Sequence, residues 1–259
     1  MAALPGFRSL HDGFLVNHPL GFIVALQAER ASLSPLRIGH HKPVSLPSGH
    51  WLILSGIGAW NAHHASRTLL GLGVRGLVSW GSAGALIDTL AAGDLILPER
   101  VLGATGDGYQ THTGWRNRLA DALMRDLPLS GGSLLESLGP IAHPDDKIAL
   151  HSATEAVAVD MESAAIAAVA RQADVPFMAI RAVADTATLI LPRCISGSVD
   201  TQGRLSIPKL LSRAAFHPEE WQQLKRLGAA FKAADQTLRT VSERALGHHF
   251  FFSSPETNA

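Results

Sequence analysis

The chain has 259 residues, a length that suits one large α/β domain or two small ones. Hydrophobic residues make up 46 % and charged residues only 17 %, so the chain can bury a large core. Lys plus Arg and Asp plus Glu both number 22, and the zero formal net charge argues against a nucleic-acid partner held by a basic surface. Low net charge also leaves little repulsion between copies, which favours a homo-oligomer.

Cysteine and histidine usage argues against a metal centre. The single cysteine, Cys194, excludes an internal disulfide and a Cys-based metal site, and it suits a reducing cytoplasm. The thirteen histidines include isolated doublets that lack a second pair at ligand spacing, so we expect no metal. We find no signal-like apolar core in residues 1–20 and no run of about 18 apolar residues, so we expect a cytoplasmic protein without a membrane span.

Short apolar runs bounded by glycine or proline mark the predicted strands. They are residues 21–26 (GFIVAL), 51–55 (WLILS), 76–80 (GLVSW), 93–98 (GDLILP) and 176–183 (PFMAIRAV). Helices are predicted between the turn at 56–58 and Gly73, over 115–127, and from Asp160 to Asp174, after a short apolar run at 156–159. Strands that alternate with helices predict a single α/β domain with a central, mostly parallel mixed sheet flanked by helices.

The last third of the chain has a different character. Residues 187–217 show no sustained period and carry prolines, which is typical of a functional or lid-like segment. A C-terminal helix follows, with one apolar stripe formed by Trp221, Leu224, Leu227, Phe231, Ala234, Leu238 and Val241. The stripe fits packing on the core or on a partner subunit, and the phenylalanines at 250–252 keep peripheral membrane contact as an alternative. We place the domain at 19–246, with 187–246 as lid-like segment plus helix, and tails at 1–18 and 247–259.

Two acidic positions suggest a site at one edge of the sheet. Glu162 lies in the run Val159-Asp160-Met161-Glu162, and Asp185 ends the predicted strand at 176–183. Ligands of α/β proteins bind outside the carboxyl ends of the strands. One carboxylate can therefore grip hydroxyls while another moves a proton. The alternative is a helix-end charge and a turn residue, and Asp160 in particular can serve as a helix cap.

Two glycine-containing loops follow predicted strands. Residues 81–84 (GSAG) offer backbone N–H groups and one hydroxyl, which suit a phosphate or a sugar oxygen as well as tight packing. Residues 56–58 (GIG) lack the third glycine of a dinucleotide fingerprint, and the chain has no P-loop motif. An NTPase is therefore not expected.

Taken in order, these motifs resemble the nucleoside phosphorylase/nucleosidase superfamily. The resemblance covers residues 21–185 and rests on GIG, GSAG, GDLILP, VDMES and RAVAD. That superfamily includes purine nucleoside and uridine phosphorylases and methylthioadenosine/S-adenosylhomocysteine nucleosidase. The long tail, LPERV and the loop at 107–109 narrow the resemblance to hopanoid-associated phosphorylases, which implies release of adenine from adenosylhopane.

The resemblance implies roles for the residues that grip the nucleoside. Asp185 matches the general acid that protonates the purine at N7, and Glu162 matches the acid that binds the ribose 2′ and 3′ hydroxyls. Met161 matches the residue packed against the sugar. Base contacts fall at Lys147 and Ile148. In the loop at 106–114, Tyr109 and His112 are candidates to close over the sugar, with an ordinary surface loop as the alternative.

The attacking group is left open between water and phosphate. Glu29 matches the nucleosidase glutamate that activates water, whereas the adjacent Arg30 suits a phosphate-binding arginine. Ser82 and Gly81 match the loop that binds either nucleophile. Ser79 stands where purine phosphorylases carry an arginine, which weakens phosphorolysis, although an arginine from a neighbouring subunit can supply the charge.

The leading expectation is therefore cleavage of the N-glycosidic bond of a lipid-bearing nucleoside, adenosylhopane. No cofactor is expected, with inorganic phosphate as an alternative co-substrate. A second hypothesis is a nucleosidase or phosphorylase for small nucleosides, and a third is a non-catalytic nucleoside-binding protein on the same fold. The first hypothesis places the protein in the cytoplasm or at the inner face of the membrane.

Overall fold

The protein is described from a computed structural model that covers residues 19–192 and 220–246. The predicted tails, the phenylalanines at 250–252 and most of the predicted lid-like segment lie outside the described residues.

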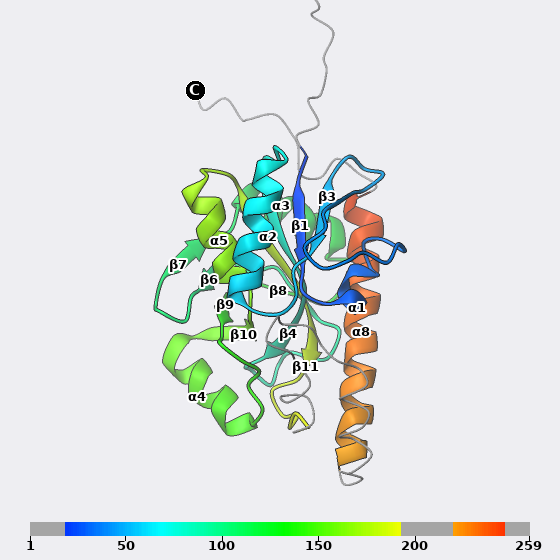
Figure 1. Cartoon of the computed structure of the whole chain (residues 1–259). Helices are drawn as coiled ribbons and strands as arrows, with labels where there is room; N and C mark the ends of the chain where they lie inside the picture. Colours follow the sequence, from blue (N-terminus) through cyan, green and yellow to red (C-terminus); the bar gives the residue numbers. More distant parts are fainter. Residues whose placement is uncertain (1–18, 193–219, 247–259) are drawn as a thin grey trace, which may run out of the picture.

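The centre of the molecule is a mixed, 11-stranded sheet (Figure 1). Its middle is formed by parallel β1 (Gly21–Val24), β4 (Leu77–Ala85) and β11 (Phe177–Asp185), with β3 (Trp51–Leu54) parallel to β1. In contrast, β10 (Ala156–Asp160) pairs antiparallel with the end of β4. The predicted α/β architecture with a mixed sheet is confirmed.

The remaining strands extend the sheet on both sides of this centre. They are β2 (Val44–Ser45), β5 (Leu95–Ile96), β6 (Arg100–Leu102), β7 (Gly108–Gln110), β8 (Leu129–Ser130) and β9 (Ser133–Glu136). The path runs β2-β3-β1-β4-β10-β9-β6-β7, and β11 joins β4 to β5, which in turn pairs with β8. The predicted strand at 93–98 is thus only two residues long in the structure.

Helices cover both faces of the sheet (Figure 1). They are α1 (Gln27–Arg30), α2 (Ala59–Gly71), α3 (Thr113–Leu123), α4 (Pro144–Thr154), α5 (Ser163–Gln172) and α8 (Trp221–Leu246). Phe22 and Val24 pack with α3 and α8, whereas Ile23 between them packs with α2 and α5. Because both faces are buried, the central strands are mostly apolar, which is why their positions could be predicted.

Of the boundaries that differ from the sequence prediction, two concern the site. β4 continues through residues 81–84, which were expected to form a loop, because these residues pair with β11. Asp160 is the last residue of β10, and α5 begins only at Ser163. Its carboxylate still accepts long hydrogen bonds from the N–H groups of Glu162 and Ser163, at 3.4 and 3.3 Å, as a helix cap would.

Helix α8 packs on the protein's own core. Leu227, Ala234, Leu238 and Val241 are buried, and the helix lies against β11 and α3. This confirms the core-packing interpretation of its apolar stripe, although Trp221 at its start remains 52 % exposed. No helix within the described residues has the length and apolar character to cross a bilayer.

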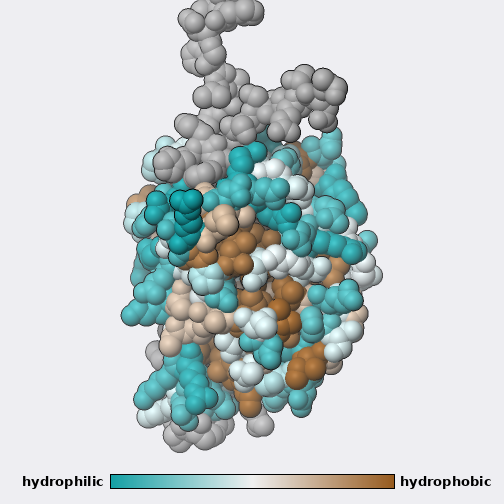
Figure 2. All heavy atoms as spheres, turned by 180° about the vertical axis from the view of Figure 1, so that it is seen from behind, coloured by the Kyte–Doolittle hydropathy of each residue, from teal (hydrophilic) through white to brown (hydrophobic). Residues whose placement is uncertain are grey.

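The surface is not uniformly polar. Seen from behind, apolar residues gather in the middle of the face and polar residues surround them (Figure 2). Over the described surface, exposed large apolar side chains include Leu36, Trp60, Met124 and Leu138. Such residues leave area for contact with another molecule, and the homo-oligomer stays a prediction.

Candidate active site

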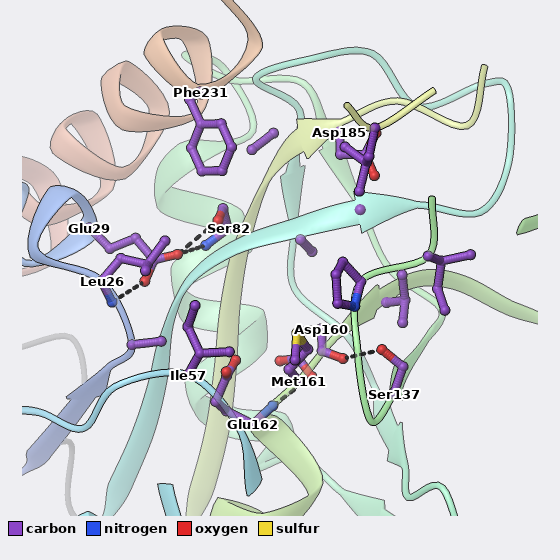
Figure 3. Close-up of a pocket in the computed structure, with 18 of the residues that line it drawn as sticks. Leu26, Glu29, Ile57, Ser82, Ser137, Asp160, Met161, Glu162, Asp185 and Phe231 are labelled. Carbon is purple, nitrogen blue, oxygen red and sulfur yellow. Dashed lines mark hydrogen bonds between the residues drawn. The ribbon is translucent and has the colours of Figure 1, made fainter. Parts of the chain in front are cut away.

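A pocket lies where β4, β10 and β11 end beside the turn that follows β1 (Figure 3). The empty space between its walls is about 770 Å³ when the open mouth is included. Four carboxylates line it, from Glu29, Asp160, Glu162 and Asp185. Its apolar walls are formed by side chains from several elements: Leu26, Ile57, Val159, Met161, Leu191, Leu227 and Phe231.

Glu29 is held against Ser82 on one wall of the pocket. The N–H and the hydroxyl of Ser82 both donate to Glu29 Oε1, at 2.8 and 2.7 Å, and the N–H of Leu26 donates to Oε2 at 3.1 Å. A Cβ at Gly81 would lie 2.7 Å from the same Oε1 and 2.7 Å from Arg181 Nη1, so glycine permits this approach. Three donors thus hold one carboxylate in a fixed position.

A buried polar network forms beneath the pocket, and its centre is Arg181 on β11. Arg181 Nε and Nη2 lie 2.9 and 2.7 Å from Asp160 Oδ2. Nη2 also donates to the hydroxyls of Ser79 and Ser163, at 2.6 and 3.1 Å. Burial lowers the pKa of Arg181, but the negative charges of Asp160, Glu162 and Glu29 raise it by more than burial lowers it. The net shift of this pKa is therefore upward. The guanidinium is the buried countercharge of the acidic pocket.

Glu162 follows β10 and is almost fully buried. The N–H of Gly58, which has a φ of 99° that suits glycine, donates to Glu162 Oε1 at 2.7 Å. Burial, and then the neighbouring charge of Asp160, raise the pKa of Glu162 to about 8. A carboxyl with this pKa keeps its proton at neutral pH, so it can both donate and accept hydrogen bonds.

Asp185 ends β11 on the opposite side of the pocket and contacts a buried lysine. Lys147 Nζ on α4 lies 2.8 Å from Asp185 Oδ1. Burial raises the pKa of Asp185 to about 6, and the hydrogen bond and charge of Lys147 oppose that rise. A carboxyl that titrates near neutrality can donate a proton at physiological pH.

The structure brings together five of the predicted residues at this pocket: Glu29, Ser82, Met161, Glu162 and Asp185. Gly81 lies directly behind Glu29, where it leaves space for the carboxylate. Lys147 does not line the pocket, but it reaches Asp185 from behind.

Four further predicted site residues do not line this pocket in the structure. Arg30 turns its guanidinium to the carbonyls of Ser34 and Leu36, because it follows Glu29 on a helix and so faces another direction. Ile148 is 58 % exposed on α4 and does not line the pocket.

The predicted lid residues belong to other contacts. Tyr109 sits on β7 with the guanidinium of Arg171 4.5 Å from its ring centroid. His112 is the N-cap of α3, where its Nδ1 accepts a hydrogen bond from the N–H of Trp115 at 3.1 Å. Both roles are structural in the described conformation.

Sequence reasoning missed Arg181, although a signal existed. A single arginine inside an otherwise apolar strand demands a buried acidic partner, and Asp160 is that partner. The sequence did not indicate that Leu227 and Phe231 form part of the pocket wall, because the apolar stripe of α8 to which they belong also packs on the core. Within the described residues, no cluster of His, Cys, Asp or Glu has the arrangement of a metal site.

Comparison with known proteins defines the class of this protein. The family model of the Phosphorylase superfamily matches residues 48–194, and the chain belongs to that superfamily. It is a nucleosidase/phosphorylase-type enzyme that cleaves N-glycosidic bonds.

The sequence relatives are nucleosidases. The chain is 29 % identical over 194 residues to the 5′-methylthioadenosine/S-adenosylhomocysteine nucleosidase of Anoxybacillus flavithermus, covering 67 % of this chain and 78 % of that protein. A Listeria welshimeri protein of the same description is 32 % identical over 162 residues, covering 52 % and 68 %.

Solved structures agree on the fold. A Neisseria meningitidis 5′-methylthioadenosine/S-adenosylhomocysteine nucleosidase in complex with methylthio-immucillin-A superposes with a TM-score of 0.66 at 19 % identity, covering 89 % of this chain and 100 % of that one. The futalosine hydrolase of Helicobacter pylori gives a TM-score of 0.61 at 17 % identity, covering 87 % and 97 %.

Proposed function

We propose that the protein hydrolyses the N-glycosidic bond of a 5′-substituted adenosine, as a nucleosidase of the methylthioadenosine/S-adenosylhomocysteine type. One observation carries the choice of water as nucleophile: both donors of Ser82 are directed to Glu29. A carboxylate in this position can orient a water molecule and accept its proton.

Three of the four acids in the pocket support a division of labour. Cleavage of a glycosidic bond passes through an oxocarbenium-like sugar, so the leaving base needs a proton and the sugar needs negative charge nearby. Asp185, with its pKa raised to about 6, is the acid that protonates the purine. Glu162 hydrogen-bonds the ribose hydroxyls, and the positive charge that develops on the sugar favours the ionised form of this carboxyl, which then stabilises the cation. Glu29 activates the attacking water.

Phosphate fits this pocket less well than water. A phosphate needs N–H and O–H donors or a cation, whereas Ser82 already donates to a carboxylate, and Arg30 points to backbone carbonyls. An anion beside Glu29 would also meet like charge. Phosphorolysis is accordingly the alternative outcome rather than the proposal.

The relatives favour a small 5′-thioadenosine as the substrate. Adenosylhopane is the second candidate, and the observation that favours it is the apolar wall formed by Leu191, Leu227 and Phe231. A wall of this kind suits an apolar 5′ substituent. The cytoplasmic location and peripheral membrane contact remain predictions.

The deciding experiment measures adenine release from methylthioadenosine, S-adenosylhomocysteine and detergent-dispersed adenosylhopane, each with and without inorganic phosphate. Phosphate-independent release with a free reducing sugar supports the proposal, and Glu29→Gln should then lower kcat by about 100-fold or more. The exposed Glu243→Gln on α8 serves as the matched control. A phosphate requirement with a sugar 1-phosphate product would refute hydrolysis, and nucleoside binding without base release would point to a non-catalytic protein.

A further inference from the structure

Lys147 is a lysine that the structure buries completely. Its ammonium has three hydrogens and three acceptors: Asp185 Oδ1 at 2.8 Å, Thr186 O at 2.7 Å and Leu189 O at 3.1 Å. Burying a charged group is costly unless it is paired and hydrogen-bonded, and here every donor has a partner. The side chain joins α4 to the segment that follows β11.

The two oxygens of Asp185 have different surroundings. Oδ1 is bound to Lys147, whereas Oδ2 lies 3.1 Å from the position where a Cβ on Gly84 would stand. Glycine at position 84 therefore leaves room for the second oxygen. Both Asp185 and Gly84 line the pocket (Figure 3, where Asp185 is labelled), whereas Lys147 does not.

We propose that Lys147 is a positioning residue for the general acid: it fixes Asp185 through Oδ1 and leaves Oδ2 to meet the purine. The inference rests on the proposed function, in which Asp185 is the proton donor. The same ammonium ties Asp185 to the backbone of residues 186–189, so it also sets the edge of the pocket.

Lys147 also stabilises the carboxylate that Asp185 becomes once it has given up its proton. The carboxylate that remains on Asp185 keeps a cation at 2.8 Å while the base departs. Of the other charged groups near it, Glu29, Asp160 and Glu162 line the same pocket, and Arg181 is committed to Asp160. Burial raises the pKa of Asp185 and Lys147 restrains that rise, so loss of the lysine charge makes Asp185 a weaker acid.

The test compares the wild type with Lys147→Met. The pKa of Asp185 is measured by 13C NMR of the side-chain carboxyl, assigned with Asp185→Asn, and the pH profile of kcat/KM is measured with methylthioadenosine. We expect the carboxyl pKa and the alkaline limb to move up together by roughly 1–3 pH units, with kcat lowered by about 10-fold or more. Lys147→Gln, which also removes the charge but keeps two donor hydrogens, repeats the test if the methionine variant does not fold.

Exposed Lys225→Met on α8 is the matched control and should change neither quantity. An unchanged pKa of Asp185 in the folded variants would overturn the inference and leave Lys147 a purely structural residue. If the wild type releases no adenine from any nucleoside, the proposed function fails, whereas the NMR titration still decides whether Lys147 controls Asp185.

Discussion

Glu162 should reduce the stability of the unliganded protein at neutral pH, and Glu162→Gln should relieve that cost. The pKa of this carboxyl rises from 4.5 to about 8 on folding, because burial disfavours its charge. Below pH 4.5 both the folded and the unfolded chain keep the proton, and the group has no effect. Between pH 4.5 and 8 only the unfolded chain loses it, so the free energy of unfolding falls as the pH rises.

The size of the effect follows from the pKa shift. At pH 7 the unfolded carboxyl lies about 2.5 pH units above its own pKa, and each unit is worth about 1.4 kcal/mol. The cost is therefore about 3 kcal/mol at pH 7 and under about 1 kcal/mol at pH 5. This is a large share of the roughly 5–15 kcal/mol that stabilises an ordinary domain. A glutamine keeps an oxygen that can accept from the N–H of Gly58 but carries no charge.

The assay is urea unfolding of the wild type and Glu162→Gln at pH 5, 6, 7 and 8, followed by tryptophan fluorescence and circular dichroism. The stability advantage of the variant should grow by about 2–3 kcal/mol between pH 5 and 7. The exposed Glu243→Gln should show no such trend. A constant difference across this pH range would refute the assignment of a raised pKa to Glu162, whatever the variant does to activity.

Three further substitutions test other parts of the structure. Arg181→Met should lower the free energy of urea unfolding by about 3–5 kcal/mol, because it leaves Asp160 buried without its partner; adding Asp160→Leu should recover part of that loss. Gly84→Ala should keep the circular dichroism spectrum but lower kcat/KM by about 10-fold or more, since its Cβ would stand 3.1 Å from Asp185 Oδ2; an unchanged kcat/KM would contradict the role of that oxygen. Leu238→Ala should cost about 2–5 kcal/mol in the same unfolding assay, because α8 buries this side chain in the core; a loss under about 1 kcal/mol would show that α8 packs loosely.

The central strands could be predicted because their signal is local. Residues 21–24 and 177–184 are buried on both faces, so each run is almost entirely apolar, with Arg181 as the exception, and stands out without knowledge of its neighbours. The end of β4 had no such signal. Gly81, Ser82 and Gly84 favour turns in isolation, and they are a strand here because β11 pairs with them residue by residue.

The site likewise combines residues that local sequence patterns indicate with residues whose contacts only the fold determines. Glu162 and Asp185 were found in the motifs VDMES and RAVAD, and Glu29 was matched through the family resemblance, by its distance from the strand at 21–26. Arg30 faces away from the pocket, because neighbouring residues on a helix point in different directions, and a one-residue shift in alignment conceals this distinction. Tyr109 and His112 contact Arg171 and Trp115 in the structure, and their positions in the sequence did not reveal these contacts.

The amino-acid sequence by itself determined the class of fold and the acidic residues of the pocket, because both depend on short patterns of burial and charge. The tertiary structure decided which groups meet. Glu29 and Ser82 are 53 positions apart, Lys147 and Asp185 are 38, and Gly58 and Glu162 are 104. These contacts depend on the order of strands in the sheet, which brings β1, β4, β10 and β11 to one edge. That order is set by the packing of the whole core, and for this reason no local stretch of the chain encodes the direction in which each carboxylate points.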